Sequence, residues 1–474
     1  SAEEAFSSIK ARTYALRKAA DMKQPQQRRG VLRMAKKAIV VGAGFAGCEA
    51  AMQLARAGIE THLYEMKPVK FSPAHKNENF AELVCSNSFK AMRIESAAGL
   101  MKEEMTYFDS ICVRIALQCS VPAGGSLSVD REKFAKMVTE EIEAQENIII
   151  HREEITKIPS APRDADAVII AAGPLVSEAL AGEIEKLCGA SLHFFDAAAP
   201  IISADSIDMD KAFFQSRYDR GEGDDYINCP MNKEEYEAFY EALLSAESAP
   251  QHDFDKRKGV YEGCMPIEVM ASRGPDTMRY GPMKPVGLRD PKTGHRPWAC
   301  LQLRRETEEG TMYNLVGFQT NLKFGEQKRV FSMIPALHDA EFLRYGVMHR
   351  NTFINSPQLL SKDYSFRSVP GLYFAGQITG VEGYMESAMS GILAGLNAAR
   401  RLSGEEPVIL PRITMMGALT DYISNPQVEN FQPMGANFGV LPPLETHIKD
   451  KKERYAAFAD RSIRCFDESM PKDD

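Results

Sequence analysis

Two cysteines of this 474-residue chain lie in settings where a thiol could act as a nucleophile or as an acid–base group. Cys264 lies in a turn-like Gly-Cys-Met-Pro run, beside an arginine-rich segment whose Arg273 and Arg279 would stabilise a thiolate. Cys85 follows an apolar segment and precedes the polar triplet Ser86–Ser88. Any single cysteine is by default a small buried hydrophobic residue, so context alone leaves both roles open for each thiol.

A glycine-rich turn after a short β-branched run predicts a dinucleotide site. Ile39–Val41 reads as a strand, Cys48–Ala57 as the following helix, and the turn between them has the pattern G-x-G-x-x-G. The turn comprises Gly42, Ala43, Gly44, Phe45, Ala46 and Gly47. The three glycines would serve the tight turn, the close approach of a pyrophosphate and the packing of helix on strand, with the helix N-terminus facing the phosphates.

An acid follows the next predicted strand. Thr61–Tyr64 ends at Glu65, whose carboxylate can accept hydrogen bonds from ribose hydroxyls and would repel a 2′-phosphate. The site therefore favours FAD or NAD over NADP, with an ordinary βαβ unit as the alternative. Two later strands end in small residues that would let a dinucleotide approach: Asp166–Pro174, which contains Gly173, and Leu372–Ala375, which leads into Gly376 and Gln377.

These elements predict an α/β fold with a discontinuous, Rossmann-like FAD-binding domain and an inserted α+β domain. Helices are expected at Ala97–Ile115, Asp130–Gln145, Asn232–Ala246 and Ser387–Arg401. The βα rhythm is lost between about residues 221 and 351. The expected organisation is a disordered basic extension at 1–36, a FAD-binding domain at 37–220 and 355–474, and an RNA- or substrate-binding domain at 221–354.

Two segments are basic in a chain whose formal net charge is −8. Residues 256–305 hold eleven Lys or Arg and four acids, interleaved with Tyr280 and Trp298. We expect a polyanion-binding face that includes Arg273, Arg289 and Arg296, with a merely solvated face as the alternative. Residues 1–38 hold ten Lys or Arg and three acids. That segment can be a non-functional extension or misassigned start ahead of Met34, an RNA-contacting tail, or a transit peptide.

Composition excludes several classes of protein. The nine cysteines form no C-x-x-C pair, which argues against a disulfide scaffold or a zinc ribbon and fits a reducing compartment. The longest apolar runs are too short to span a bilayer. No metal and no membrane partner are expected.

Several stretches between about residues 37 and 466 resemble the bacterial folate- and FAD-dependent tRNA (uracil-5-)-methyltransferases. The most specific are EGCMPIEVM and RYGVMHRNTFINSP, accompanied by GAGFAGCEAA, FAELVCSNSFK and GLYFAGQITGVEGYMESAMSG. The resemblance implies a bacterial cytoplasmic enzyme that binds FAD and methylates C5 of a uridine in the tRNA T loop (m5U54). Its carbon donor would be 5,10-methylenetetrahydrofolate and its reductant NADH or NADPH.

This chemistry explains why two thiols matter. Uracil C5 becomes nucleophilic when a thiolate adds to C6; C5 then attacks a methylene, loses its proton, and the methylene is reduced to methyl. The resemblance implies Cys264 as the nucleophile, Cys85 as its partner near the flavin, and reduced FAD as hydride source and methylene carrier. His349, in the matched Met-His-Arg-Asn run, would contact folate or flavin, with a satisfied core histidine as the alternative.

The sequence leaves other functions open. A paralogous family related to glucose-inhibited division protein A shares the FAD fold and modifies wobble uridines, and some close relatives act on ribosomal RNA, so the target is tRNA or rRNA. A flavin disulfide reductase would need two close cysteines, and Cys85 and Cys264 are far apart in sequence. A non-catalytic, flavin-bearing RNA-binding protein would need neither thiol.

Overall fold

The computed structural model describes most of the chain after the basic N-terminal segment. Residues 1–35 lie outside the described part, so the prediction of a disordered extension is not addressed. The described residues are 36–189, 192–197, 199–219, 225–249, 265–306, 310–346, 348–428 and 431–469.

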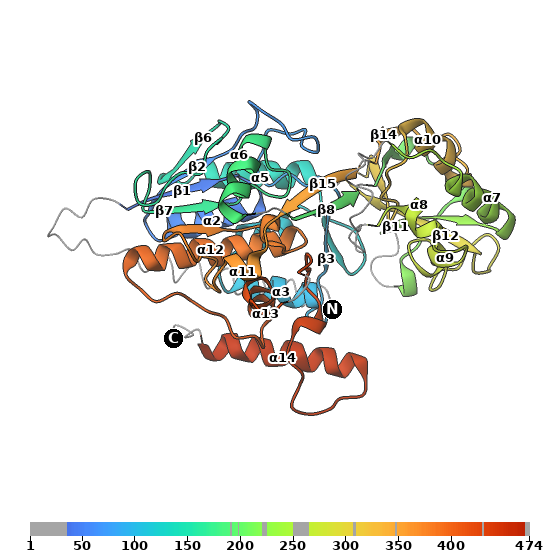
Figure 1. Ribbon diagram of the computed structural model, residues 1–474. Helices are drawn as coiled ribbons and strands as arrows, with labels where there is room; N and C mark the ends of the chain where they lie inside the picture. The colour runs from blue at the N-terminus through green and yellow to red at the C-terminus, as the bar shows by residue number, and fades with distance from the viewer. Residues whose placement is uncertain are drawn as a thin grey trace.

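A parallel five-stranded sheet forms the centre of the first lobe, in the order β16-β7-β1-β2-β6 (Figure 1). Its strands are β1 (Lys37–Val41), β2 (Glu60–Tyr64), β6 (Ile148–His151), β7 (Ala167–Ile170) and β16 (Leu372–Phe374). Strand β1 is buried on both faces, because Val40 packs into one hydrophobic cluster and Ile39 into another. Burial on both sides is typical of a central parallel strand and confirms the predicted α/β class.

Two helices of small residues lie side by side against this sheet: α2 (Phe45–Arg56) and α12 (Tyr384–Ser403) (Figure 1). A Cβ added at Gly391 would lie 2.1 Å from the carbonyl oxygen of Ala46, and one at Gly395 would lie 2.6 Å from that of Ala50. The four-residue spacing on both helices puts these contacts on facing stripes. The two backbones therefore touch, and the N-terminal half of the fold is held by a helix from the C-terminal half.

The predicted helix over Ala97–Ile115 is wrong as a single element. The structure has two helices, α3 (Ala97–Thr106) and α4 (Ile111–Gln118). Asp109 turns into the left-handed region at φ 49°, and the Ser110 hydroxyl caps α4 by accepting a hydrogen bond from the Val113 amide. The apolar stripe that suggested one helix is real, since both helices bury it.

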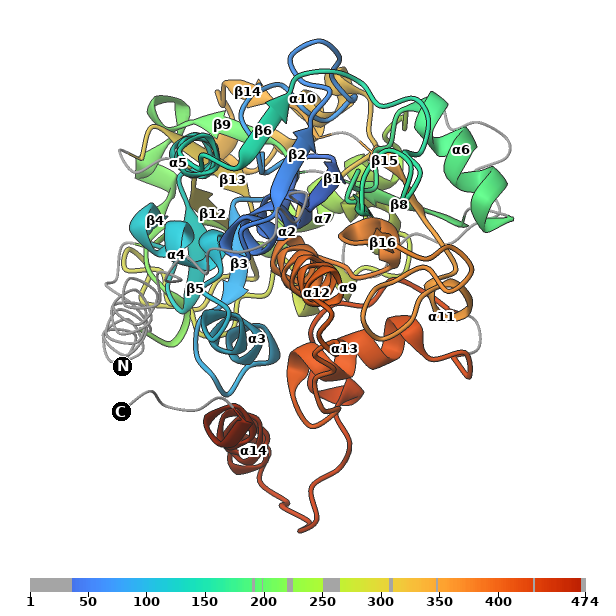
Figure 2. The same ribbon diagram turned by 90° about the vertical axis from the view of Figure 1, so that its left-hand side faces the viewer.

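The other predicted helices are confirmed with small shifts. Asp130 caps α5 (Arg131–Glu143), and Asn232 forms a capping box with Glu235 at the start of α7 (Lys233–Leu244). The remaining helices and strands of the first lobe are β3 (Ser88–Ala91), β4 (Ser120–Val121), β5 (Ser126–Val129), α6 (Glu178–Cys188), α11 (Ser356–Leu359), α13 (Met415–Ser424) and α14 (Lys451–Ser469). Helix α14 lies at the outside and packs on α3 (Figure 2).

An antiparallel six-stranded sheet forms the second lobe, in the order β10-β11-β12-β13-β9-β14. Its strands are β9 (Ile201–Ser203), β10 (Phe213–Phe214), β11 (Tyr226–Met231), β12 (Ala299–Arg305), β13 (Met312–Leu315) and β14 (Phe342–Arg344). Helices α7, α8 (Ile267–Ala271), α9 (Thr277–Tyr280) and α10 (Phe324–Phe331) accompany it around a separate hydrophobic core. The inserted α+β unit is confirmed, while the boundaries at residues 220 and 354 stay a prediction.

A two-stranded ribbon joins the lobes. Strand β8 (Leu192–Ala197) pairs antiparallel with β15 (Met348–Phe353), and Figure 1 shows this ribbon running between the two sheets. Among the residues that the structure describes, no helix is long and apolar enough to cross a bilayer.

Candidate functional site

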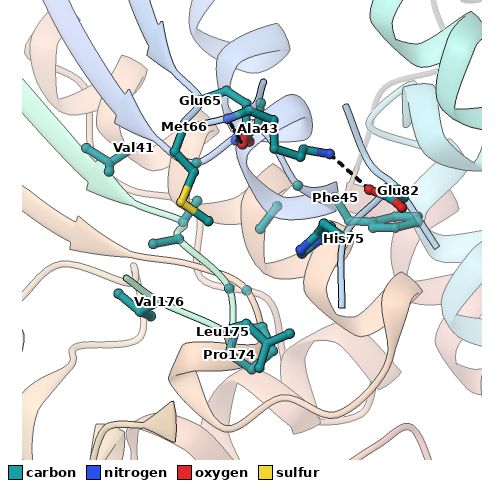
Figure 3. A pocket seen from close by; sticks show the side chains of 18 of the residues that line it. Val41, Ala43, Phe45, Glu65, Met66, His75, Glu82, Pro174, Leu175 and Val176 are labelled. Carbon is teal, nitrogen blue, oxygen red and sulfur yellow. Dashed lines mark hydrogen bonds and ion pairs between the residues drawn. The ribbon is translucent and has the colours of Figure 1, made fainter. Parts of the chain in front are cut away.

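A cleft opens at the carboxyl ends of β1, β2 and β7. It contains about 1090 Å³ of empty space, measured out to its opening into solvent. Figure 3 shows Glu65 and Met66 on one side and Pro174, Leu175 and Val176 on the other. Nine of the ten residues predicted to bind the cofactor line this cleft: Gly42, Ala43, Gly44, Phe45, Ala46, Glu65, Gly173, Gly376 and Gln377.

Each glycine of the turn has a different physical constraint. Gly42 has φ 99°, and a Cβ there would lie 2.5 Å from the carbonyl oxygen of Ala171. Gly47 does not line the cleft; its Cβ would lie 1.7 Å from the Gly42 carbonyl oxygen, so it allows the helix to pack on the turn. Gly44 is the N-cap of α2, and nothing lies within 4 Å of a Cβ built there.

These features fit a dinucleotide. Gly44 and Gly173 both line the cleft, and empty space surrounds a Cβ built at either position, so a ligand can approach their backbone. No side chain caps α2, which leaves the amides of its first turn for a phosphate. This is the arrangement expected where a pyrophosphate meets a helix N-terminus.

The buried carboxylate of Glu65 ties the strand end to the turn. Its Oε2 accepts a hydrogen bond from the Ala43 amide at 3.0 Å, and its Oε1 accepts one from the Lys67 amide at 3.0 Å. Each carboxylate oxygen retains a further lone pair. Glu65 can therefore hold the turn and still accept a ribose hydroxyl.

Cys85 lies beside this cleft, linked to it through one tyrosine. The amide of Cys85 donates to the phenol oxygen of Tyr384 at 2.9 Å, and the Cys85 sulfur lies 3.1 Å from the same oxygen. Tyr384 lines the cleft, and its ring packs on that of Phe45 with 4.9 Å between centroids. Burial raises the pKa of Tyr384 well above its usual value, so the phenol is neutral at physiological pH.

Three arginines surround the segment that carries Cys85. Arg131 donates to the Leu83 carbonyl at 3.2 Å, Arg344 to the Val84 carbonyl at 2.5 Å, and Arg304 to the Ser86 hydroxyl at 2.7 Å and to the Asn87 side-chain oxygen at 2.9 Å.

Only part of this positive charge is compensated within the cluster. Glu306 is fully buried and pairs with Arg131 at 2.5 Å, which outweighs burial and raises the pKa of Arg131. Burial lowers the pKa of Arg304 and of Arg344, while their interaction with the Cys85 sulfur opposes that effect. Cations near a sulfur stabilise its thiolate form, so this is a setting for a reactive thiol.

Other cysteines are in the opposite environment. Burial raises the pKa of Cys300 to about 12 and raises that of Cys48, Cys112 and Cys229 well above the usual value. Cys48, on α2, is completely buried, as expected of a structural cysteine.

The predicted substrate residues are not gathered at the cleft. Cys264 lies outside the described residues, which resume at Met265. His349 lies on β15, where its backbone position is paired with that of Asp196. Arg273, Arg289 and Arg296 are exposed on the second lobe.

Sequence reasoning missed Tyr384 and the three arginines. Tyr384 directly follows the glycine loop and precedes the predicted small-residue helix; an aromatic residue at that junction is the one available signal. Arg131, Arg304 and Arg344 come from segments far apart in the chain, and no local pattern links them. Within the described ranges, no group of three or more His, Cys, Asp or Glu side chains could hold a metal ion.

Comparison with known proteins agrees with this geometry. The family model described as "Glucose inhibited division protein A" matches residues 37–406. The methylenetetrahydrofolate--tRNA-(uracil-5-)-methyltransferase TrmFO of Halalkalibacterium halodurans is 55% identical over 434 residues, which is 91% of this chain and 98% of that protein. The protein of the same name from Bacillus cytotoxicus is 56% identical over 425 residues, 90% of this chain and 96% of the relative.

Among solved structures, GidA of Aquifex aeolicus has a TM-score of 0.66 at 17% identity, covering 93% of this chain and 74% of that one. At this low identity the likeness concerns the fold alone. The extensive identity to the two enzymes is decisive: the chain belongs to the methylenetetrahydrofolate--tRNA-(uracil-5-)-methyltransferase family, within the wider glucose inhibited division protein A family.

Proposed function

We propose that this protein methylates C5 of a uridine in tRNA, with 5,10-methylenetetrahydrofolate as carbon donor and FAD as redox cofactor. Family membership supports the reaction class. The observation that carries the proposal is the position of Cys85, bonded through Tyr384 to a dinucleotide-type cleft and surrounded by guanidinium groups. A buried structural cysteine would need neither feature.

In the proposed reaction the two thiols have different tasks. The Cys264 thiolate adds to uracil C6, and the C5–C6 electron pair moves into the enolate. C5 then attacks the electrophilic methylene carbon. The Cys85 thiolate then takes the C5 proton, and the bond between the methylene carbon and its carrier nitrogen breaks. Hydride adds to the resulting exocyclic carbon, which expels the Cys264 sulfur from C6 and restores the C5–C6 double bond.

The chain's own residues would hold the reactants in place. The Gly42–Gly47 turn and the α2 N-terminus would bind the pyrophosphate, and Glu65 the ribose, while Gly173, Gly376 and Gln377 would line the opposite wall. When bound, FAD supplies the hydride that reduces the transferred carbon. Tyr384 would hold the Cys85 sulfur toward the cleft, and His349 is proposed to meet the folate or the flavin.

The finer assignments are also part of the proposal. The target would be the T-loop uridine that becomes m5U54, the reductant NADH or NADPH, and the compartment the bacterial cytoplasm. Arg273, Arg289 and Arg296 would contact the RNA backbone, because they are exposed cations in a chain of net negative charge.

Carbon-labelled methylenetetrahydrofolate tests the reaction directly. The protein is incubated with FAD, NADH or NADPH, and either undermodified tRNA or undermodified ribosomal RNA. We expect the label in a methyl group attached to C5 of a T-loop uridine in tRNA. The Cys85→Ala variant should transfer no label. Cys465→Ala is the matched control, because that partly buried cysteine lies on α14. Label only in ribosomal RNA would reassign the target. Disulfide turnover without RNA labelling would show that the protein is a reductase. Binding of FAD and RNA without either activity would show that it is a non-catalytic protein.

A further inference from the structure

A second cavity lies on the far lobe, away from the cofactor cleft. Measured in the same way as the cleft, it contains about 1740 Å³ of empty space. Its lining combines one aromatic side chain with several cations. Those used below are Trp298, Arg279, Lys233, Lys211, Lys292 and Arg296.

Trp298 is held in a fixed position at this groove. The guanidinium of Arg279 lies 3.7 Å from the centre of the Trp298 ring, and its Nε donates to the Trp298 carbonyl at 3.0 Å. Asp276 pairs with the same guanidinium at 2.5 Å. The tryptophan is nevertheless 37% exposed. An aromatic ring fixed by a cation and open to solvent is a ready stacking surface.

The charges of the groove favour an anionic ligand. Three acids line the groove: Glu235 accepts from the Asn232 amide at 2.8 Å, Asp290 accepts from the Lys292 amide at 2.9 Å, and Asp210 is exposed. Arg296 is exposed and has no ion-pair partner in the part of the chain that the structure describes. Of the five lining Lys and Arg side chains, Lys211, Lys233 and Arg279 pair with Asp208, Glu237 and Asp276. The positive charge left for an anionic ligand is therefore on Arg296 and Lys292, although the whole chain is acidic.

Strand β12 connects this groove to the surroundings of the reactive cysteine. Trp298 immediately precedes β12, while Arg304, near its other end, bonds to Ser86 beside Cys85. Six residues of extended chain span about 20 Å. A single nucleotide is too short to reach both places, whereas a stretch of RNA backbone is long enough.

We infer that the groove around Trp298 is a second RNA-binding site, which holds the substrate RNA about 20 Å from the reacting uridine. An unpaired base stacks on Trp298, and Arg296 and Lys292 contact its flanking phosphates. This inference rests on the proposed function for the identity of the RNA. The site positions the RNA and takes no part in the chemistry.

Trp298 is the single tryptophan of the chain, so its fluorescence reports on the groove alone. We expect undermodified tRNA to quench this fluorescence in a saturable, salt-dependent way. The Arg296→Gln variant should bind tRNA more weakly and lower the slope of log affinity against log salt by about 1. The inference would be overturned if saturating tRNA did not quench the fluorescence. It would also be overturned if the slope of log affinity against log salt were the same in Arg296→Gln and wild type.

Steady-state kinetics separate positioning from catalysis. Trp298→Ala should raise the KM for tRNA about tenfold, while kcat at saturating tRNA stays unchanged. Trp298→Phe should restore most of the affinity because a phenyl ring still stacks. Phe324→Ala is the control: that side chain is 54% exposed on α10 of the same lobe and does not line the groove. Loss of affinity in Phe324→Ala equal to that in Trp298→Ala would reject a specific groove.

Direct binding keeps the two proposals separable. Tight tRNA binding that needs Trp298 and Arg296, in a protein that transfers no label, would contradict the proposed function and leave the groove standing. Label transfer by a protein whose tRNA affinity does not change in either variant would support the proposed function and contradict the groove as an RNA-binding site. Sedimentation of each variant tests the other occupant: self-association lost in Trp298→Ala would show that the groove binds a second copy instead.

Discussion

The sulfur of Cys85 and the phenol oxygen of Tyr384 lie 3.1 Å apart, although 299 residues separate them in the chain. The same oxygen accepts the Cys85 amide proton at 2.9 Å, so the tyrosine orients both the backbone and the side chain of the cysteine. This contact connects the loop that carries the thiol to the helix that lines the cofactor cleft.

The Tyr384→Phe variant removes that oxygen and keeps the ring that packs on Phe45. We expect methyl transfer to fall about 10- to 100-fold, in line with the loss of a hydrogen bond to a charged group, with unchanged FAD content. Single-turnover transfer of labelled carbon to tRNA measures the change. Tyr422→Phe is the control, because it also removes a phenol hydrogen bond, to the Gln432 carbonyl, outside the cleft. Equal activity of Tyr384→Phe and wild type would show that the contact is only structural.

Gly44→Val should release FAD from a folded protein. The backbone of Gly44 is extended, and a Cβ there meets no protein atom, so valine fits the fold but occupies the space meant for a pyrophosphate. We expect the FAD content to fall below about a tenth of wild type with little loss of thermal stability. Gly125→Val, at another glycine with open surroundings, should keep its flavin. A yellow Gly44→Val protein with full FAD would contradict this assignment of the cleft.

Glu104 should make the stability of the first lobe depend on pH. Its carboxylate is fully buried and accepts hydrogen bonds from the amides of Met415 and Met416 and from the Ser462 hydroxyl. Burial raises the pKa of Glu104 from 4.5 to about 7. Between these values the folded state holds a proton that the unfolded state has lost, so stability falls as pH rises from about 4.5 to 7 and is lowest above 7.

The shift corresponds to at most about 3 kcal/mol of unfolding free energy. Thermal melts of wild type and Glu104→Gln at pH 5 and pH 8 test it. Because Glu104→Gln removes one hydrogen-bond acceptor, its stability differs from that of wild type at both pH values. The difference between its melting temperatures at pH 5 and pH 8 should still be smaller than in wild type. An identical pH dependence in both proteins would show that Glu104 does not titrate in this range.

Covalent adducts trapped with a modified RNA distinguish the roles of the two proposed catalytic thiols. tRNA that carries 5-fluorouridine cannot lose a proton from C5, so the covalent complex with the nucleophile accumulates. We expect denaturing gels to show the adduct with wild type and with Cys85→Ala, and none with Cys264→Ala. The opposite pattern would exchange the two roles. Full methylation by both variants would reject thiol catalysis.

The sequence predicts the cofactor cleft well because that part of the site is local. The glycine turn, its helix and Glu65 lie within one βαβ unit; backbone geometry alone requires Gly42 and Gly47, and Gly44 leaves the space that a pyrophosphate needs. The split between α3 and α4 was not predicted, because it depends on a left-handed residue, Asp109, inside an apolar stripe that continues across it.

The surroundings of Cys85 could not be predicted in the same way. Tyr384, Arg131, Arg304 and Arg344 reach the cysteine from four separate elements, and their effect on it depends on burial that only the tertiary fold creates. A sequence pattern can identify a cysteine of suitable type, but it does not show how many guanidinium groups the fold brings beside it.

The contact of Gly391 and Gly395 with Ala46 and Ala50 also determines the order of events during synthesis. Helix α2, which presents the cofactor turn, emerges from the ribosome more than 300 residues before α12, the helix that supports it. Until then the stripe of α2 that carries Ala46 and Ala50 has no helix packed against it, while the second lobe, with its own core, emerges complete in between. A nascent chain therefore completes the cofactor-binding domain only after the second lobe has emerged, and chains halted before α12 leave this stripe of α2 exposed to the cell's quality control.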